Sequence, residues 1–116
     1  MPSWLPDFAF YRDAWRGELD EESFGRAMPH AEAAVREIVH PRDPSDAPEQ
    51  HRRAVCAACD VDAAHGFSGG AGEGGSIRLG SFSASGAGAD GGYSADMLAA
   101  VRAQLAGTRL LYRGLS

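Results

Sequence analysis

The sequence predicts a mainly α-helical protein, a small bundle of three to four helices with an inserted β-hairpin or extended glycine-rich loop. Two observations lead to this fold class. Apolar residues recur at helical spacing in three stretches, and each stretch is bounded by residues that commonly begin or end helices. Between the second and third stretch, residues 66–92 hold eleven of the fifteen glycines, too many for any helix. Because the chain has 116 residues, we expect a single domain, 1–116, with one modest core.

Residues 1–19 form an N-terminal arm that is rich in aromatic side chains. Pro2 and Pro6 interrupt it, and its aromatic spacing fits neither a helix nor a strand, so we expect an irregular conformation. The rings should pack on the helices of the same chain or on a neighbouring subunit. A platform for stacked nucleotide bases is the least favoured interpretation, because no basic cluster accompanies the rings. The residues assigned to arm packing are Trp4, Phe8, Phe10, Tyr11 and Trp15.

The first predicted helix begins after Asp20, which is a suitable N-cap, and it carries two glutamates in its first turn. It ends near His40, because Pro41 disfavours helical backbone at the residue before it. Pro29 lies inside this stretch, so we expect a kink, or two helices with Pro29 at the first position of the second. The apolar residues that share one face are Phe24, Ala27, Met28, Ala31, Val35 and Ile38.

Two further helices are predicted. One has Pro48 at its first position and runs to about His65, with Gly66 as the stop signal. The residues that line one face of it are Val55, Ala58, Cys59 and Asp62, with Cys56 and Ala63 beside them. The last helix opens with Ser94 as its N-cap and closes at Gly107. Its apolar side consists of Met97, Leu98, Val101 and Leu105.

The remaining segments are predicted to make contacts outside the bundle. Within 66–92, residues 76–85 alternate between apolar and polar, which is typical of one strand or two short ones. The buried face of this strand consists of Ile77, Leu79 and Phe82. Residues 108–116 form a tail with adjacent apolar residues, and such a segment commonly binds a partner. The tail residues assigned to this contact are Leu110, Leu111, Tyr112 and Arg113.

The charge pattern excludes some classes of protein. The formal net charge is −5, and all eleven basic residues are arginines, scattered along the chain. A nucleic-acid reader needs clustered positive charge, so the pattern argues against an antitoxin-like or regulatory DNA-binding domain. No run approaches the roughly 20 apolar residues that span a bilayer. The start of the chain also lacks the pattern of a secretory signal, so we expect no membrane partner.

Cys56 and Cys59 form a CxxC pair, the only feature with a serious redox or metal interpretation. A structural zinc site needs four ligands, and neither a second cysteine pair nor a close histidine pair completes one. The cysteines also lie in the middle of a predicted helix, where no helix end lowers a thiol pKa. We therefore interpret both as small apolar core residues.

Other candidate motifs are weaker. Residues 70–75 match GxGxxG, but the strand before it and the helix after it that dinucleotide binding requires are not predicted. The histidines are dispersed, and we expect them to be solvated surface residues; they are His30, His40, His51 and His65. No residues form a credible catalytic, cofactor-binding or metal-binding set, so we expect a protein that is not an enzyme.

Several short motifs follow one another in a recognisable order. Residues 7–11 read Asp-Phe-Ala-Phe-Tyr and lead to the acidic helix start at 20–24. Residues 53–57 read Arg-Ala-Val-Cys-Ala, residues 79–85 read Leu-Gly-Ser-Phe-Ser-Ala-Ser, and residues 110–114 read Leu-Leu-Tyr-Arg-Gly. With these motifs the chain resembles the head-tail connector family of long-tailed bacteriophages, which are also called head-tail adaptor or head completion proteins.

The resemblance implies a structural virion protein whose copies form a ring, expected to be twelve-fold, that joins the portal of a phage capsid to the tail. The implied partners are the portal protein and a stopper or tail-terminator protein, and DNA passes through the channel non-specifically. The implied location is the head-tail interface of the virion, after assembly in the bacterial host cytoplasm. In this setting the 66–92 segment contacts the channel or the next ring, and the tail contacts the portal or a neighbouring subunit.

Two alternatives remain open. One is a tail-completion or neck protein of the same particle. The other belongs to a different class: a small cytosolic redox or metal-binding protein that uses Cys56 and Cys59. Stoichiometric zinc, or a thiol pKa well below the usual value of about 8.5, would favour this second alternative.

Overall fold

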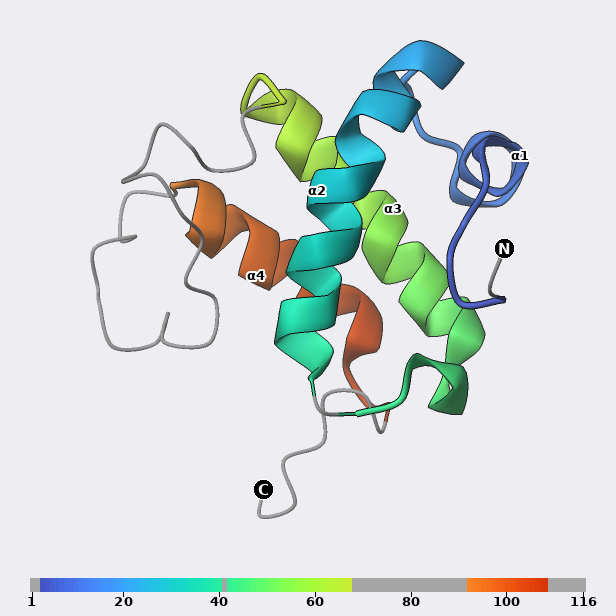
Figure 1. Ribbon diagram of the computed structural model, residues 1–116, viewed down its shortest axis with the longest axis vertical. Helices are drawn as coiled ribbons and strands as arrows, with labels where there is room; N and C mark the ends of the chain where they lie inside the picture. The colour runs from blue at the N-terminus through green and yellow to red at the C-terminus, as the bar shows by residue number, and fades with distance from the viewer. Residues whose placement is uncertain (1–2, 41, 68–91, 109–116) are drawn as a thin grey trace.

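The computed structural model describes residues 3–40, 42–67 and 92–108 (Figure 1). Of these residues 74% are helical and none forms a strand, which confirms the mainly α-helical fold class. The predicted hairpin or loop lies outside the described residues, apart from the ends of the 66–92 segment. The helical elements are α1 (Phe8–Phe10), the π-helical turn η1 (Tyr11–Trp15), α2 (Glu21–Val39), the 3₁₀ turn η2 (Pro44–Asp46), α3 (Pro48–Ala64) and α4 (Tyr93–Leu105).

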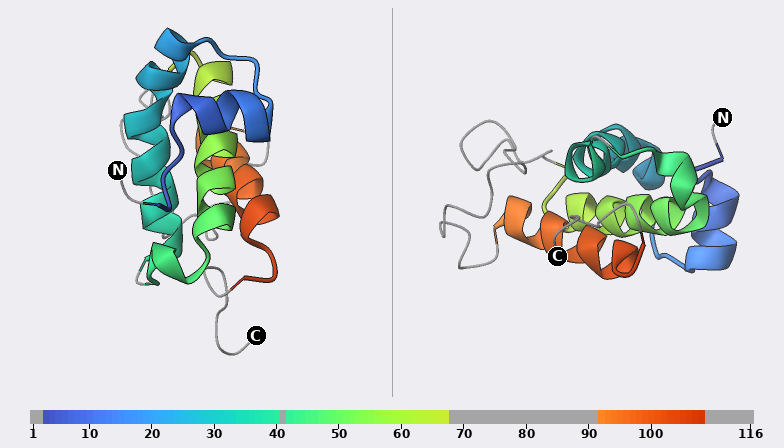
Figure 2. Two further views of the ribbon diagram at one scale, coloured as in Figure 1. Left: turned by 90° about the vertical axis from the view of Figure 1, so that its right-hand side faces the viewer. Right: turned by 90° about the horizontal axis from the view of Figure 1, so that it is seen from below.

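Three helices make the body of the protein, and α3 lies between α2 and α4 (Figure 2). The arm with α1 and η1 covers one edge of these layers, beside α3. Each helix contributes apolar side chains to one continuous core, as the recurrence of apolar residues predicts. The fully buried core residues include Ala31 and Val35 from α2, Val55 and Cys59 from α3, and Met97, Val101 and Leu105 from α4.

The first helix follows its sequence signals closely. The Asp20 carboxylate accepts a hydrogen bond of 2.8 Å from the backbone N–H of Ser23, so it caps α2 as predicted. Pro29 lies inside α2, and the expected division into two helices is wrong, because α2 is continuous across it. A proline ring clashes with the carbonyl four residues earlier, which belongs here to exposed Gly25. Because Gly25 is exposed, water can take the place of the helical hydrogen bond that Pro29 does not donate.

Glycines close α3 and α4 where the sequence places them. Gly66 and Gly107 have φ angles of 74° and 85°, a left-handed conformation that favours glycine and that ends each helix. The predicted start of α4 was wrong by two residues, because Gly92 rather than Ser94 is the N-cap. No side chain caps this end.

The arm is more ordered than its sequence suggests. The expectation of an irregular segment was wrong, because residues 8–15 form α1 and the π-helical turn η1. Asp7 starts the turn by accepting a hydrogen bond of 2.8 Å from the backbone N–H of Phe10. Arg16, with φ of 66°, ends it. Among the described residues, no helix is long and apolar enough to cross a bilayer.

Candidate functional site

The later part of the arm is held to α3 by the carboxylate of Asp60. The Tyr11 hydroxyl donates a hydrogen bond of 2.6 Å to one Asp60 oxygen, and the Trp15 indole N–H donates one of 2.9 Å to the other. The Tyr11 oxygen also accepts a hydrogen bond of 3.1 Å from the backbone N–H of Leu19. Burial and the bond to Asp60 raise the pKa of Tyr11, so its hydroxyl stays protonated and remains a donor.

The arm and α2 are connected by a close passage at Gly17. A Cβ atom at this position would lie 2.0 Å from Cζ of Tyr11, a distance that real contacts do not reach. Only glycine therefore lets the backbone cross the buried tyrosine ring. The conformation of the arm therefore depends on Gly17 as well as on the hydrogen bonds of Tyr11 and Trp15.

The first half of α3 holds the start of the arm. His51 is 2% exposed, and its Nδ1 lies 2.6 Å from the carbonyl oxygen of Trp4. The Arg52 guanidinium donates to the carbonyl of Ser3 and also lies over the ring of Phe10, with Cζ 4.9 Å from the ring centre. The start of the arm therefore lies against α3 through both backbone and aromatic contacts.

His51 is neutral in the folded protein. Burial lowers its pKa below the usual 6.5, against a smaller opposing effect of the hydrogen bond to Trp4. Because a carbonyl only accepts, Nδ1 of His51 carries the proton and Nε2 carries the lone pair. Nε2 has no hydrogen-bond partner among the described residues.

A second carboxylate of α3, that of Asp62, joins the three helices. It is completely buried, accepts a hydrogen bond of 2.7 Å from the Tyr93 hydroxyl of α4 and lies 2.9 Å from Nδ1 of His30 on α2. Asp60 and Asp62 are two residues apart, which separates them by about 200° around the helix. One carboxylate therefore faces the arm while the other faces the core.

The expectation of solvated surface histidines was wrong for His51, which is buried. His30 and His65 are partly exposed, but each is paired with a carboxylate; Nε2 of His65 lies 2.9 Å from Asp96. His40 is exposed, as expected. Sequence spacing does not reveal these pairs, because the partners lie on different helices.

Both cysteines of the CxxC pair lie in the core. Cys56 and Cys59 are 0% exposed, and burial raises the pKa of Cys56 to about 12 and that of Cys59 further still. Their thiols are therefore protonated at neutral pH, whereas nucleophilic attack and metal binding need a thiolate. Over residues 3–40, 42–67 and 92–108, no three side chains gather as metal ligands. These observations support the interpretation of both cysteines as core residues.

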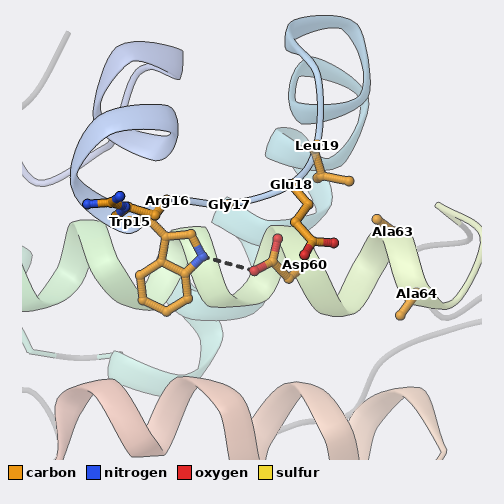
Figure 3. Close-up of a pocket in the computed structure, with 8 residues that line it drawn as sticks. All are labelled: Trp15, Arg16, Gly17, Glu18, Leu19, Asp60, Ala63 and Ala64. Carbon is orange, nitrogen blue, oxygen red and sulfur yellow. Dashed lines mark hydrogen bonds between the residues drawn. The ribbon is translucent and has the colours of Figure 1, made fainter.

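A surface groove of about 630 Å³ opens between the arm and α3 (Figure 3). Residues 15–19 form one wall, and Asp60, Ala63 and Ala64 of α3 form the other. In Figure 3 the carboxylate of Glu18 is directed toward α3 and Asp60, and Arg16 extends on the far side of Trp15 from both. The lining of the groove therefore combines acidic carboxylates with apolar side chains.

The predicted site residues fall into two groups. Of the arm residues, Tyr11 is fully buried and Phe8, Phe10 and Trp15 pack against the core of the same chain. Trp4 is half-buried. The predicted channel or next-ring contacts, Ile77, Leu79 and Phe82, and the predicted portal or subunit contacts, Leu110, Leu111, Tyr112 and Arg113, lie outside the described residues.

Comparison with protein-family models, with curated proteins and with solved structures found no match.

Proposed function

We propose that this protein is a non-enzymatic structural subunit of a tailed phage particle, and that its copies form a head-tail connector ring below the portal. The observation that carries the proposal is the use of the buried and partly buried polar side chains of α3. Asp60 and Asp62 each hold a donor from another segment, and the two thiols are buried and protonated. These groups hold the arm and helices in place, which is typical of a structural subunit.

The helical fold supports the same proposal, because the resemblance implies a small helical bundle with an aromatic arm. A ring subunit needs a rigid body and surfaces that meet its neighbours. The three-helix body with a fastened arm supplies the first requirement. The net charge of −5 suits a channel wall that DNA slides past, since like charges do not bind.

The decisive experiment removes the gene from a genome that carries it and examines the particles produced. We expect filled heads that lack tails, and restoration of joined particles when the gene is supplied on a plasmid. Reconstruction of the neck of restored particles should show a ring of helical subunits on the portal. Normal tailed particles without the protein, or its absence from purified virions, would reject the proposal.

A further inference from the structure

We propose that the groove between the arm and α3 receives residues 109–116 of a second copy of this chain. The inference rests on the proposed function and deepens it, because it names the contact by which neighbours in the ring hold one another. Three observations carry it: the charge of the groove, the composition of the tail, and the positions of the two on the molecule.

The groove is suited to a segment that is both cationic and apolar. Glu18 is exposed, and Asp60, although it already accepts two hydrogen bonds, retains further acceptor positions on its oxygens. The half-buried side chains of Trp15 and Leu19 present apolar surface beside these carboxylates. A volume of about 630 Å³ lies within the range of about 300–1,000 Å³ that is usual for binding pockets.

The tail has the complementary composition. Residues 109–116 contain two arginines, Arg109 and Arg113, and no acidic residue. Between the arginines lie two leucines and a tyrosine. Guanidinium groups pair with carboxylates through two parallel hydrogen bonds. The apolar residues of the tail suit the apolar side chains that line the groove.

The end of α3, which lines the groove, and the end of α4, which precedes the tail in sequence, lie at opposite ends of the body (Figure 1). His65, just after α3, lies 2.9 Å from Asp96 in the first turn of α4, so α4 begins where α3 ends and then runs back. The end of α4 is therefore remote from the end of α3, where Ala63 and Ala64 line the groove.

This separation favours a second copy over the chain's own tail. Because α4 begins at the end of α3 and runs back, its 13 residues separate the end of α4 from the end of α3 by about 20 Å, and residues 109–116 reach at most about 26–29 Å when fully extended. The chain's own tail would therefore have to be largely extended along the body, with a loss of conformational entropy. The tail can enter the groove of a neighbouring copy without being extended in this way. Contacts from one end to the other are heterologous, and they close into a ring when the rotation allows it.

A charge-reversal experiment on full-length chains tests the inference, with association measured by sedimentation velocity and native mass spectrometry over a concentration series. The groove variant is Glu18→Arg, and the tail variant combines Arg109→Glu with Arg113→Glu. We expect each variant alone to associate at least about tenfold more weakly than the wild type, because like charges then meet. Mixed in equal amounts, the two variants should associate again in alternating order, because the unchanged tail of the groove variant meets the unchanged groove of the tail variant and the two reversed surfaces attract each other.

Two controls separate this contact from general effects. A single chain that carries all three substitutions should regain association to within a few-fold of the wild type, because the exchanged charges attract again. Glu37→Arg makes the same charge change at an exposed position near the other end of α2 and should leave association unchanged.

These outcomes test the groove contact separately from the proposed connector function. A wild-type chain that stays monomeric throughout the series, or mixed variants that do not associate, would overturn the inference while the virion experiment could still succeed. Association of the mixed variants together with absence from virions would retain the groove contact and reject the connector role.

Discussion

Single residues decide how the arm meets the body, and Gly17 illustrates this best. We expect Gly17→Ala to lower the free energy of unfolding by about 1–3 kcal/mol, because its Cβ would clash with the Tyr11 ring. Urea denaturation followed by circular dichroism measures the change. Gly25→Ala is the matched control, since nothing lies within 4 Å of its Cβ in α2. This control should raise the free energy of unfolding by about 0.5–1 kcal/mol; equal effects of both substitutions would contradict the close passage.

His51 should make stability sensitive to acid. Its folded pKa is lowered by burial, so the unfolded chain takes up a proton first as the pH falls below the ordinary value of 6.5. The contribution of His51 to stability is complete above that value and is lost as the pH falls from 6.5 toward the lower folded pKa. Glu32 on α2 acts in the opposite direction on the same ring, but its effect is smaller.

We therefore expect the wild type to lose more free energy of unfolding between pH 7.5 and pH 5 than His51→Asn does. Asparagine retains a donor at the position of Nδ1, for the Trp4 carbonyl, and does not titrate. Urea denaturation at the two pH values measures the difference. Parallel pH profiles for the two proteins would show that His51 is not the acid-sensitive group.

At the scale of elements, the arm is a separate unit that Asp60 fastens to α3. We expect Asp60→Ala to cost about 2–4 kcal/mol, since it leaves the Tyr11 hydroxyl and the Trp15 indole N–H without their partner. Hydrogen exchange should show faster exchange in residues 8–19 and little change in α4. Asp13→Ala is the control, because Asp13 is exposed and pairs only with the adjacent Arg12 among the described residues. Uniform acceleration across all helices would show that the arm is not a separate unit.

At the scale of the whole molecule, the core residues that the structure describes come from the arm and the helices. Over residues 3–40, 42–67 and 92–108, the buried side chains run from Pro6 to Leu105, and the Thr108 hydroxyl closes the end of α4 with a hydrogen bond of 2.7 Å to the Leu105 carbonyl. We therefore expect a chain that ends at Thr108 to keep the helical circular dichroism and urea midpoint of the full chain. The same truncated chain should fail to attach to portal rings in co-sedimentation. Full attachment would remove the tail from the proposed contacts.

Much of the fold could be predicted from local sequence, because helix boundaries depend on neighbouring residues. Asp20, Pro48, Gly66 and Gly107 act through their own backbone or through groups three residues away or nearer. The arm was harder, since its Asp7 cap precedes too short a helical stretch for a periodic pattern to emerge. Pro29 was ambiguous, because only an exposed position with accessible backbone allows a helix to continue through it.

The candidate site could be predicted only in part. The five aromatic arm residues were identified by composition, but their anchor, Asp60, was not. The available signal was the pair of aspartates within a run of small apolar residues of α3, since buried carboxylates need donors. Those donors come from the arm, α2 and α4, and a single sequence does not show which distant segments meet.

The amino-acid sequence by itself determined the helical class, the ends of α2 and α3 and the burial of the two cysteines, because propensity, capping and periodicity are local properties. The tertiary structure alone decided which segments share a carboxylate, where the groove lies and which histidine is buried. These features depend on packing between residues 30 to 50 positions apart, as between Tyr11 and Asp60 or between His30 and Asp62. Hydrogen bonds across that separation form only after the helices have assembled.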